Sequence, residues 1–124
     1  MAQSPQPTEI TLHRQSRVLE VRFADGAAYR LPFEFLRVYS PSAEVRGHGP
    51  GQEVLQAGKK DVDVLAVEPV GAYAIQLKFS DGHDTGIYSW ELLYEYGQRQ
   101  QKLWQQYLER LREAGASREA QPAP

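Results

Sequence analysis

The side chains best suited to chemistry in this sequence are its three histidines, because imidazole can bind a metal or exchange a proton near neutral pH. His83 follows an Asp-Gly pair and stands between Asp81 and Asp84, where a carboxylate could orient the ring as in many metal and acid–base sites. On the residues alone, an exposed histidine in a turn is the simpler interpretation. His13 falls at a polar position of an alternating stretch, so we expect it to be solvated.

His48 lies in the glycine-rich stretch RGHGPG, which begins at Arg46. Backbone N–H groups of such glycines could approach an anion, and Arg46 could add charge. The glycine spacing is not that of a P-loop, so a flexible loop is the simpler interpretation. The sequence has no nucleophile motif, no His-Glu pair at helical spacing and no carboxylate cluster of the metal-binding type. An enzyme that uses His83 as acid–base is therefore the weakest of our hypotheses.

The composition limits the classes of protein to consider. A chain of 124 residues is long enough for one domain with a core, and the absence of cysteine excludes disulfides and thiolate metal sites. No apolar run approaches the ~20 residues that a membrane span needs, and the first residues lack a signal-peptide pattern, so we expect a cytoplasmic protein. Residues 61–97 carry one basic and seven acidic side chains, which argues against a nucleic-acid surface.

Two stretches of the chain repeat one pattern. LEVRFADG (19–26) and IQLKFSDG (75–82) both alternate apolar and polar residues and end in Asp-Gly. The alternation predicts half-buried antiparallel strands, and Asp-Gly predicts a tight hairpin turn after each. Return strands are expected near 28–31 and 85–88. Apolar residues near 10–12 and 62–67 predict a further strand before each hairpin, with a turn over 69–72.

A helix is predicted after each hairpin. Pro32 suits a first helical position and Ser89 an N-cap. The first helix must end before Pro41, whereas the second continues along an apolar stripe and could break at Gly97. The stripe consists of Leu92, Leu93, Tyr96, Leu103, Trp104, Tyr107, Leu108 and Leu111. The chain therefore predicts an α+β fold, with two small antiparallel sheets from a duplicated β-β-β-α unit and a long C-terminal helix.

The ends of the chain differ from the rest in composition. Residues 1–8 and 114–124 are small, polar and proline-bearing, which predicts disordered ends around a single domain over residues 9–113. The 23 residues from 39 to 61 hold four glycines and two prolines, so we expect an irregular connection there. Connections of this length are usually functional or disordered.

LRVYSPSAEVRGHGPG (36–51) and PVGAYAIQLKFSDGHDTGIYSWELL (69–93) together resemble the gamma-butyrobetaine hydroxylase-like N-terminal domain family, a former domain of unknown function. The resemblance covers roughly residues 10–96 and implies a small stand-alone bacterial member. Other members are fused to iron–sulfur cluster carrier ATPases of the Mrp type, or precede the oxygenase domain of carnitine-synthesis enzymes. The iron and 2-oxoglutarate chemistry of those enzymes belongs to that separate domain.

The resemblance also bears on metal binding. In the carnitine-synthesis enzymes this domain holds a structural zinc through C-x-C-x-x-C and one histidine. The matching positions here are Ser40, Ser42, Val45 and His83. Neutral hydroxyls are poor zinc ligands and valine is none, so we expect no cofactor and a lost zinc site. Iron or another metal at this place has no support in the sequence.

In the layout that the resemblance implies, the segment from Ser40 to His48 returns toward His83. The candidate binding patch consists of Ser40, Ser42, Glu44, Arg46, His48, Asp81 and His83. We predict a non-catalytic accessory or interaction module with a protein partner. The fusions associate the module with iron–sulfur or metal handling. They also suggest an iron–sulfur cluster carrier as its partner. A metal-binding protein with an altered site of His83 and His48 is the second hypothesis.

Overall fold

Both Asp-Gly pairs form hairpin turns with the same hydrogen bonds. In the first turn the N–H of Phe23 donates to the carbonyl of Ala27 over 2.8 Å, and in the second the N–H of Phe79 donates to the carbonyl of His83 over 2.9 Å. The two glycines have φ angles of 92° and 91°, in the left-handed region that glycine adopts without steric cost. His83 therefore stands where the first hairpin has Ala27.

The computed structural model describes residues 5–120. The elements run in the order β1 (Pro7–His13), β2 (Val18–Phe23), β3 (Ala28–Pro32), α1 (Phe33–Val38), α2 (Ala43–Arg46), β4 (Val64–Val70), β5 (Ala74–Phe79), β6 (Ile87–Ser89) and α3 (Trp90–Glu113). The predicted α+β fold is confirmed. Among these residues, no helix has the length and apolarity that crossing a membrane would require.

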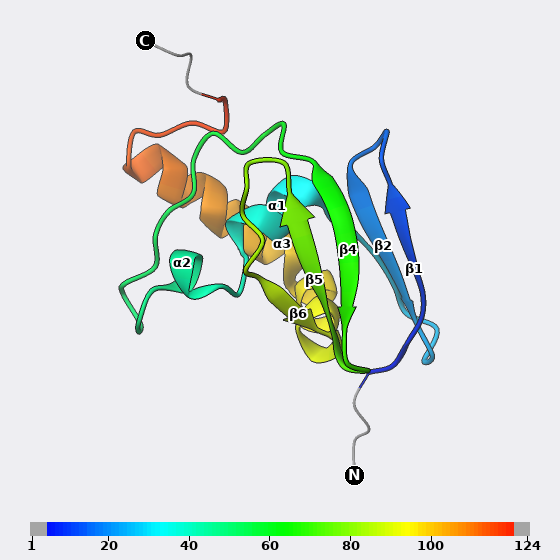
Figure 1. Ribbon diagram of the computed structural model, residues 1–124. Helices are drawn as coiled ribbons and strands as arrows, with labels where there is room; N and C mark the ends of the chain where they lie inside the picture. Colours follow the sequence, from blue (N-terminus) through cyan, green and yellow to red (C-terminus); the bar gives the residue numbers. More distant parts are fainter. Residues whose placement is uncertain (1–4, 121–124) are drawn as a thin grey trace.

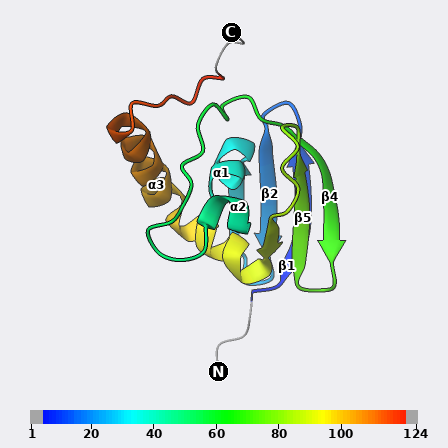
Figure 2. The ribbon, with the colours of Figure 1, turned by 60° about the vertical axis from the view of Figure 1, so that its left-hand side comes forward.

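The strands form two antiparallel three-stranded sheets, β1-β2-β3 and β4-β5-β6, each with the predicted repeat strand in the middle. In Figure 1 the strands stand on one side of the molecule and the helices on the other. The view in Figure 2 shows α1, α2 and α3 in front of the strands. Each unit thus supplies one sheet and the helix that follows it.

The core lies between the sheets and the helices. Alternate residues of β2 and β5 point into it, as the period of two predicts, because successive strand side chains face opposite sides. The main members are Leu19, Val21, Phe23, Leu31, Phe33, Phe35, Leu36, Val64, Ile75, Leu77, Phe79, Tyr88 and Leu93. This interior connects the two sheets with α1 and the first half of α3.

The long helix α3 begins as the sequence predicts and continues past its glycine to Glu113, as the apolar stripe predicts. The Ser89 hydroxyl caps it by accepting the N–H of Leu92 over 3.1 Å. The helix has no break at Gly97. A Cβ at this position would lie 2.1 Å from the ring of Tyr29, so glycine is needed for the close approach of α3 to β3.

Some predicted boundaries differ from the structure, among them the return strand expected near 85–88, which is β6 over Ile87–Ser89. The connection over 39–61 contains the short helix α2, which the glycines and prolines around it obscure in the sequence. Strand β4 continues through Pro69 and Val70, where we expected a turn. Proline can be tolerated there because β4 is an edge strand, in which every second N–H points away from its partner β5 and makes no ladder hydrogen bond.

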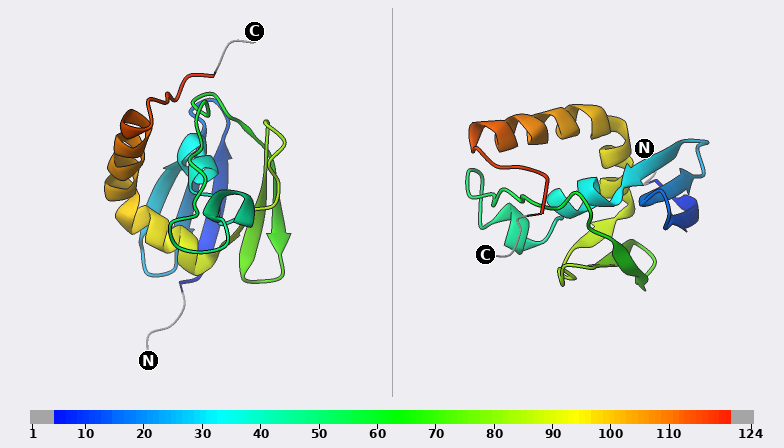
Figure 3. Two further views of the ribbon diagram at one scale, coloured as in Figure 1. Left: turned by 90° about the vertical axis from the view of Figure 1, so that its left-hand side faces the viewer. Right: turned by 90° about the horizontal axis from the view of Figure 1, so that it is seen from above.

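The ends of the chain also differ from the prediction within the described range. Strand β1 begins at Pro7 rather than Glu9. After α3 the chain returns along the connection before β4, where the N–H groups of Gly58 and Lys60 donate to carbonyls of Ser117 and Arg118. Both views in Figure 3 show this return of the segment after α3. Residues 1–4 and 121–124 lie outside the described residues.

Candidate functional site

The loop after α1 is shaped by two serines and a proline. Pro41 disfavours a helical conformation at Ser40, so α1 ends and the chain turns. Ser42 accepts the N–H of Glu44 over 3.2 Å and thereby caps α2. This local geometry brings the side chains of Ser40 and Glu44 to the turn of the second hairpin, where His83 lies.

His83 is held at both ring nitrogens. Nε2 lies 2.8 Å from the hydroxyl oxygen of Ser40, and Nδ1 lies 2.9 Å from a carboxylate oxygen of Glu44. An ionised carboxylate only accepts hydrogen bonds, so Nδ1 carries the hydrogen and donates it to Glu44. Nε2 of the neutral ring then accepts the hydroxyl hydrogen of Ser40. The Ser40 oxygen accepts the N–H of Ser42 in turn, over 3.3 Å.

Burial explains the charge state of His83. The residue is 6% exposed, whereas its partner Glu44 keeps a side chain that is 63% exposed. Burial disfavours the imidazolium and the guanidinium of Arg37 repels it, so the pKa of His83 is lowered despite the opposing effect of Glu44 and Asp81. A neutral ring agrees with the tautomer that the hydrogen bonds require.

Asp81 forms the charged part of the same site. Partial burial by itself raises the pKa of Asp81, but hydrogen bonds from Lys59, from the N–H of His83 and from Arg37 lower it to about 2. Lys59 Nζ lies 2.6 Å and Arg37 Nε 2.8 Å from the same carboxylate oxygen. The pair with Arg37 is enclosed, because that side chain is only 8% exposed. Asp81 therefore stays ionised and joins α1, the connection and the hairpin.

Two predicted members of the patch do not join this network. Arg46 extends toward α3, where it donates to the hydroxyl of Tyr96 over 3.3 Å. His48 is exposed in the turn after α2. Within the described range, no group of three or more His, Cys, Asp or Glu side chains is arranged to hold a metal ion. The structure thus gathers Ser40, Ser42, Glu44, Asp81 and His83.

Comparisons with known proteins place this chain in a family. A sequence model of the family described as gamma-butyrobetaine hydroxylase-like, N-terminal, matches residues 10–94. The chain belongs to this family. No curated protein matches it.

Solved structures of similar proteins support the membership in the gamma-butyrobetaine hydroxylase-like N-terminal family. Two NMR solution structures are 47% and 51% identical, with TM-scores of 0.83 and 0.81. The matches cover 98% and 100% of this chain, and 95% and 94% of those chains. A crystal structure from Acidithiobacillus ferrooxidans is 49% identical, with a TM-score of 0.56, over 71% of this chain and 88% of that chain. It is described as a protein of unknown function in the DUF971 family.

The positions that match the zinc ligands of some members of this family do not fit a zinc ion here. The Ser40 hydroxyl and Nε2 of His83 are hydrogen-bonded to each other. The Ser42 hydroxyl lies 2.6 Å from the hydroxyl of Thr85, and Val45 is a buried apolar side chain. This set offers one imidazole nitrogen and two neutral hydroxyls, without any thiolate.

Sequence reasoning missed three residues of the site: Arg37, Lys59 and Thr85. Arg37 carried a signal, because it directly follows PFEFL, a stretch in which only Glu34 is charged, and a cation next to buried apolar residues needs a partner. Lys59 and Thr85 carried none. Lys59 stands in the irregular connection, and Thr85 falls at the start of an expected return strand, where nothing indicates its contact with Ser42. One terminal nitrogen of Arg37 is buried without a hydrogen-bond partner among residues 5–120.

Proposed function

We propose that this protein is a non-catalytic accessory module that binds another protein. The observation that carries the proposal is the engagement of both nitrogens of the buried His83 by Ser40 and Glu44. The side chain best suited to chemistry is used to hold the loop after α1 against the second hairpin. Because the residues of this site hold the protein's own loops in place, they support a role in shaping a surface that a partner binds.

The weaker hypothesis of a small enzyme meets an obstacle in the same network. Serine, histidine and glutamate stand in the order of a nucleophile, a base and an orienting carboxylate. However, Ser40 is 0% exposed, and its oxygen already accepts the N–H of Ser42. A substrate carbonyl would have to displace that contact at a residue that solvent does not reach, which favours the accessory role.

The hypothesis of an altered metal site needs His48 and His83 together. His48 is exposed beyond α2, while His83 is enclosed and uses both nitrogens in hydrogen bonds. Binding a metal through both would require His83 to release Ser40 or Glu44. The interaction module requires no such rearrangement.

The second sheet offers the surface for a partner. Large exposed apolar side chains among residues 5–120 are Val54, Leu65, Tyr73, Ile87 and Leu108. Three of these five belong to β4, to β6 or to the turn between β4 and β5, the sheet coloured green in Figure 1. Exposed apolar side chains among polar neighbours mark interaction surfaces.

The negative charge around the second sheet limits the kind of partner that can bind it. Residues 61–97, which include the whole second sheet, carry one basic and seven acidic side chains. A partner with a basic rim around an apolar contact would complement this surface. Among candidates, we propose an iron–sulfur cluster carrier of the Mrp type, because the family resemblance implies fusions between these two kinds of protein.

The experiment measures binding to the purified Mrp-type carrier ATPase from the same organism by isothermal titration calorimetry. We expect a complex that Ile87→Lys and Tyr73→Lys each weaken by about tenfold or more, as substitutions of central interface residues do. Leu108→Lys is the matched control, because it places the same charge on an exposed apolar position of α3. It should leave the affinity unchanged.

Two results would contradict the proposal. One is the absence of a complex with the carrier in both its cluster-free and its cluster-loaded form. The other is a complex that the two sheet variants and the helix variant weaken equally, because the second sheet would then not be the contact surface. Circular dichroism of each variant verifies that its fold is retained.

A further inference from the structure

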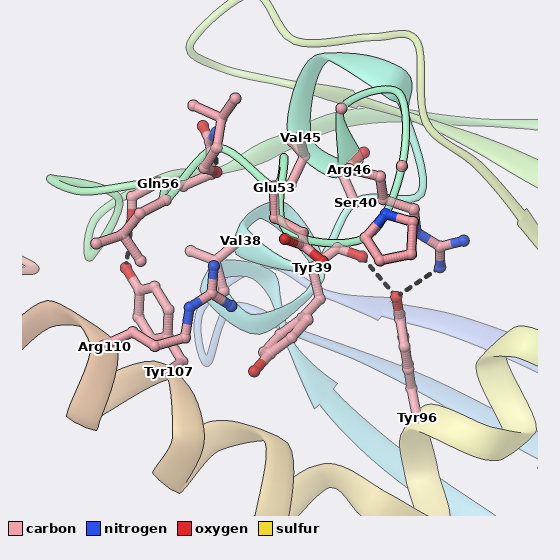
Figure 4. A pocket seen from close by; sticks show the side chains of 15 residues that line it. Val38, Tyr39, Ser40, Val45, Arg46, Glu53, Gln56, Tyr96, Tyr107 and Arg110 are labelled. Carbon is pink, nitrogen blue, oxygen red and sulfur yellow. Dashed lines mark hydrogen bonds between the residues drawn. The ribbon is translucent and has the colours of Figure 1, made fainter.

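A cavity of about 500 Å³ lies between α3 and the segment that follows α2. This volume is within the range of small-molecule sites. Figure 4 shows that its side chains come from α1, α2, the connection before β4 and α3. The cavity meets the network around His83 at Ser40, which belongs to both, and the proposed protein contact does not use it.

The wall formed by the connection is fixed in shape. The N–H of Val54 donates to the carbonyl of Val45 over 2.8 Å, and the hydroxyl of Tyr107 donates to the carbonyl of Gln56 over 2.6 Å. Gly47 has a φ of 72°, and a Cβ there would lie 2.2 Å from the carbonyl oxygen of Gln52. The glycine-rich stretch is thus folded back on itself, which forms the cavity in advance of any ligand.

The charges around the cavity favour an anion. Arg46 and Arg110 reach it from α2 and α3, and Glu53 reaches it from the connection (Figure 4). Backbone N–H groups of Glu53 itself and of Gly51 lower the pKa of Glu53, so its carboxylate stays ionised. Two guanidinium groups and one carboxylate leave a net charge of +1. The two guanidinium groups attract a carboxylate, and Glu53 would repel a second carboxylate placed next to it.

The two arginines differ in what they already bind. Arg46 donates to the hydroxyl of Tyr96 over 3.3 Å, which orients its guanidinium. Arg110 forms no ion pair with a carboxylate among residues 5–120. Burial raises the pKa of the Tyr39 hydroxyl, and the guanidinium of Arg110 lies close enough to oppose this rise. The planar fork of Arg110 can bind a carboxylate through two hydrogen bonds. Arg110 is the primary anchor, and Arg46 adds longer-range attraction.

The remaining walls are largely apolar. The rings of Tyr39 and Tyr107 form one side, and Val38 and Leu55 complete it. The three tyrosine hydroxyls of the cavity already donate to backbone carbonyls, so the rings present their faces and edges to the interior. Aromatic walls of this kind pack well against a flat or branched apolar group.

We propose that this cavity is a binding site for a small aromatic monocarboxylate, with the carboxylate on Arg110 and the ring against the tyrosines. The specificity follows from the charges, because Glu53 repels a second carboxylate. An uncharged amide of the same shape would fill the apolar part and lose the charge-assisted hydrogen bonds.

The test uses ¹⁵N-labelled full-length protein and NMR titration with benzoate, 3-phenylpropionate and indole-3-acetate. We expect at least one of them to shift the amide signals of Gly49, Val54 and Gln56, which line the cavity. The matched primary amide should bind about tenfold more weakly or worse, and so should the matched dicarboxylate. Arg110→Gln should reduce the affinity for the carboxylate to that for the amide.

The control is Arg112→Gln on the same helix, because that side chain is 75% exposed and does not line the cavity. It should leave the affinity unchanged. The proposal is overturned if none of the three acids binds, if acid and amide bind equally, or if both arginine variants have the same effect. Signal shifts confined to another part of the molecule would also overturn it. Retained amide spectra of both variants verify that they fold.

Discussion

The hydroxyl oxygen of Ser40 lies 2.8 Å from Nε2 of His83, and the two residues join segments that are 43 positions apart in the chain. The family resemblance implies that both positions match zinc ligands in the carnitine-synthesis enzymes. A hydrogen bond between neutral groups here connects the same two segments that a metal would connect there. Because this bond contributes only about 1 kcal/mol, the packed interior must supply most of the stability.

This relationship predicts that zinc binding can be restored. In the variant Ser40→Cys, Ser42→Cys and Val45→Cys, three thiolates and His83 would provide the tetrahedral ligand set that zinc prefers. We expect about one zinc per chain after dialysis against metal-free buffer, and a thiolate charge-transfer spectrum with cobalt. Elemental analysis of the untagged protein gives the stoichiometry.

The same triple variant with His83→Asn is the control for this gain of zinc. It retains the three thiolates and loses the imidazole, so it should bind zinc much more weakly and shift the cobalt spectrum. Stoichiometric zinc in the unmodified protein would contradict our interpretation, because the two serine oxygens would then have to serve as ligands.

The neutral state of His83 predicts a pH dependence of stability. In the unfolded chain a histidine titrates near pH 6.5, whereas burial lowers the pKa of His83 in the folded protein. Between these two values the unfolded state binds more protons, so the free energy of unfolding should fall as the pH falls below about 6.5. Urea denaturation over a series of pH values measures this slope.

Two variants assign that slope to its residue. His83→Gln should remove part of the pH dependence, while His48→Gln should not, because His48 is exposed. Asp81 does not interfere, since its pKa of about 2 lies well below this range. Equal slopes for His83→Gln and the unmodified protein would show that the ring is not held neutral by its surroundings.

The sequence determines the two β-β-β-α units well, because each signal is local. Alternation in β2 and β5, the Asp-Gly turns and the N-cap at Ser89 depend on neighbours within a few residues. Pro32, expected in the first helical position, is instead the last residue of β3, and α1 begins at Phe33. The position of Ser40 next to His83 followed from the family resemblance. Neither the local sequence pattern nor the family resemblance predicts the ion pair of Arg37 with Asp81. The residues around Arg37 do not indicate that it contacts Asp81, and those around Asp81 do not indicate Arg37.

The close packing at Gly97 predicts that alanine there destabilises the protein, although helix propensity favours alanine over glycine. Alanine in a helix interior is normally favoured over glycine by about 1 kcal/mol. At this position, however, a Cβ would lie 2.1 Å from the ring of Tyr29. We expect Gly97→Ala to lower the free energy of unfolding by about 1–3 kcal/mol, as overpacking does. Gln98→Ala, one residue later on an exposed face, is the control in the same denaturation assay.

We expect residues 114–120, which follow α3, to contribute to the stability of the fold, although their composition does not suggest it. Arg118 donates to both carboxylate oxygens of Glu34 over 2.8 and 2.7 Å, and Glu34 is only 7% exposed. Removing the cation leaves a buried carboxylate without its partner. Because the Arg118 side chain is 39% exposed, water can replace part of the loss. We expect Arg118→Gln to cost about 1–2 kcal/mol.

The guanidinium of Arg118 also lies 5.3 Å from the ring centre of Trp104, so the fluorescence of this tryptophan should change in Arg118→Gln. Lys60→Gln is the matched control, because it removes an exposed ion pair with Glu119 in the same region. Exposed pairs contribute little, so this variant should unfold at the same urea concentration as the unmodified protein. Equal stability of the two variants would mean that residues 114–120 do not hold α1 and α3 together in solution.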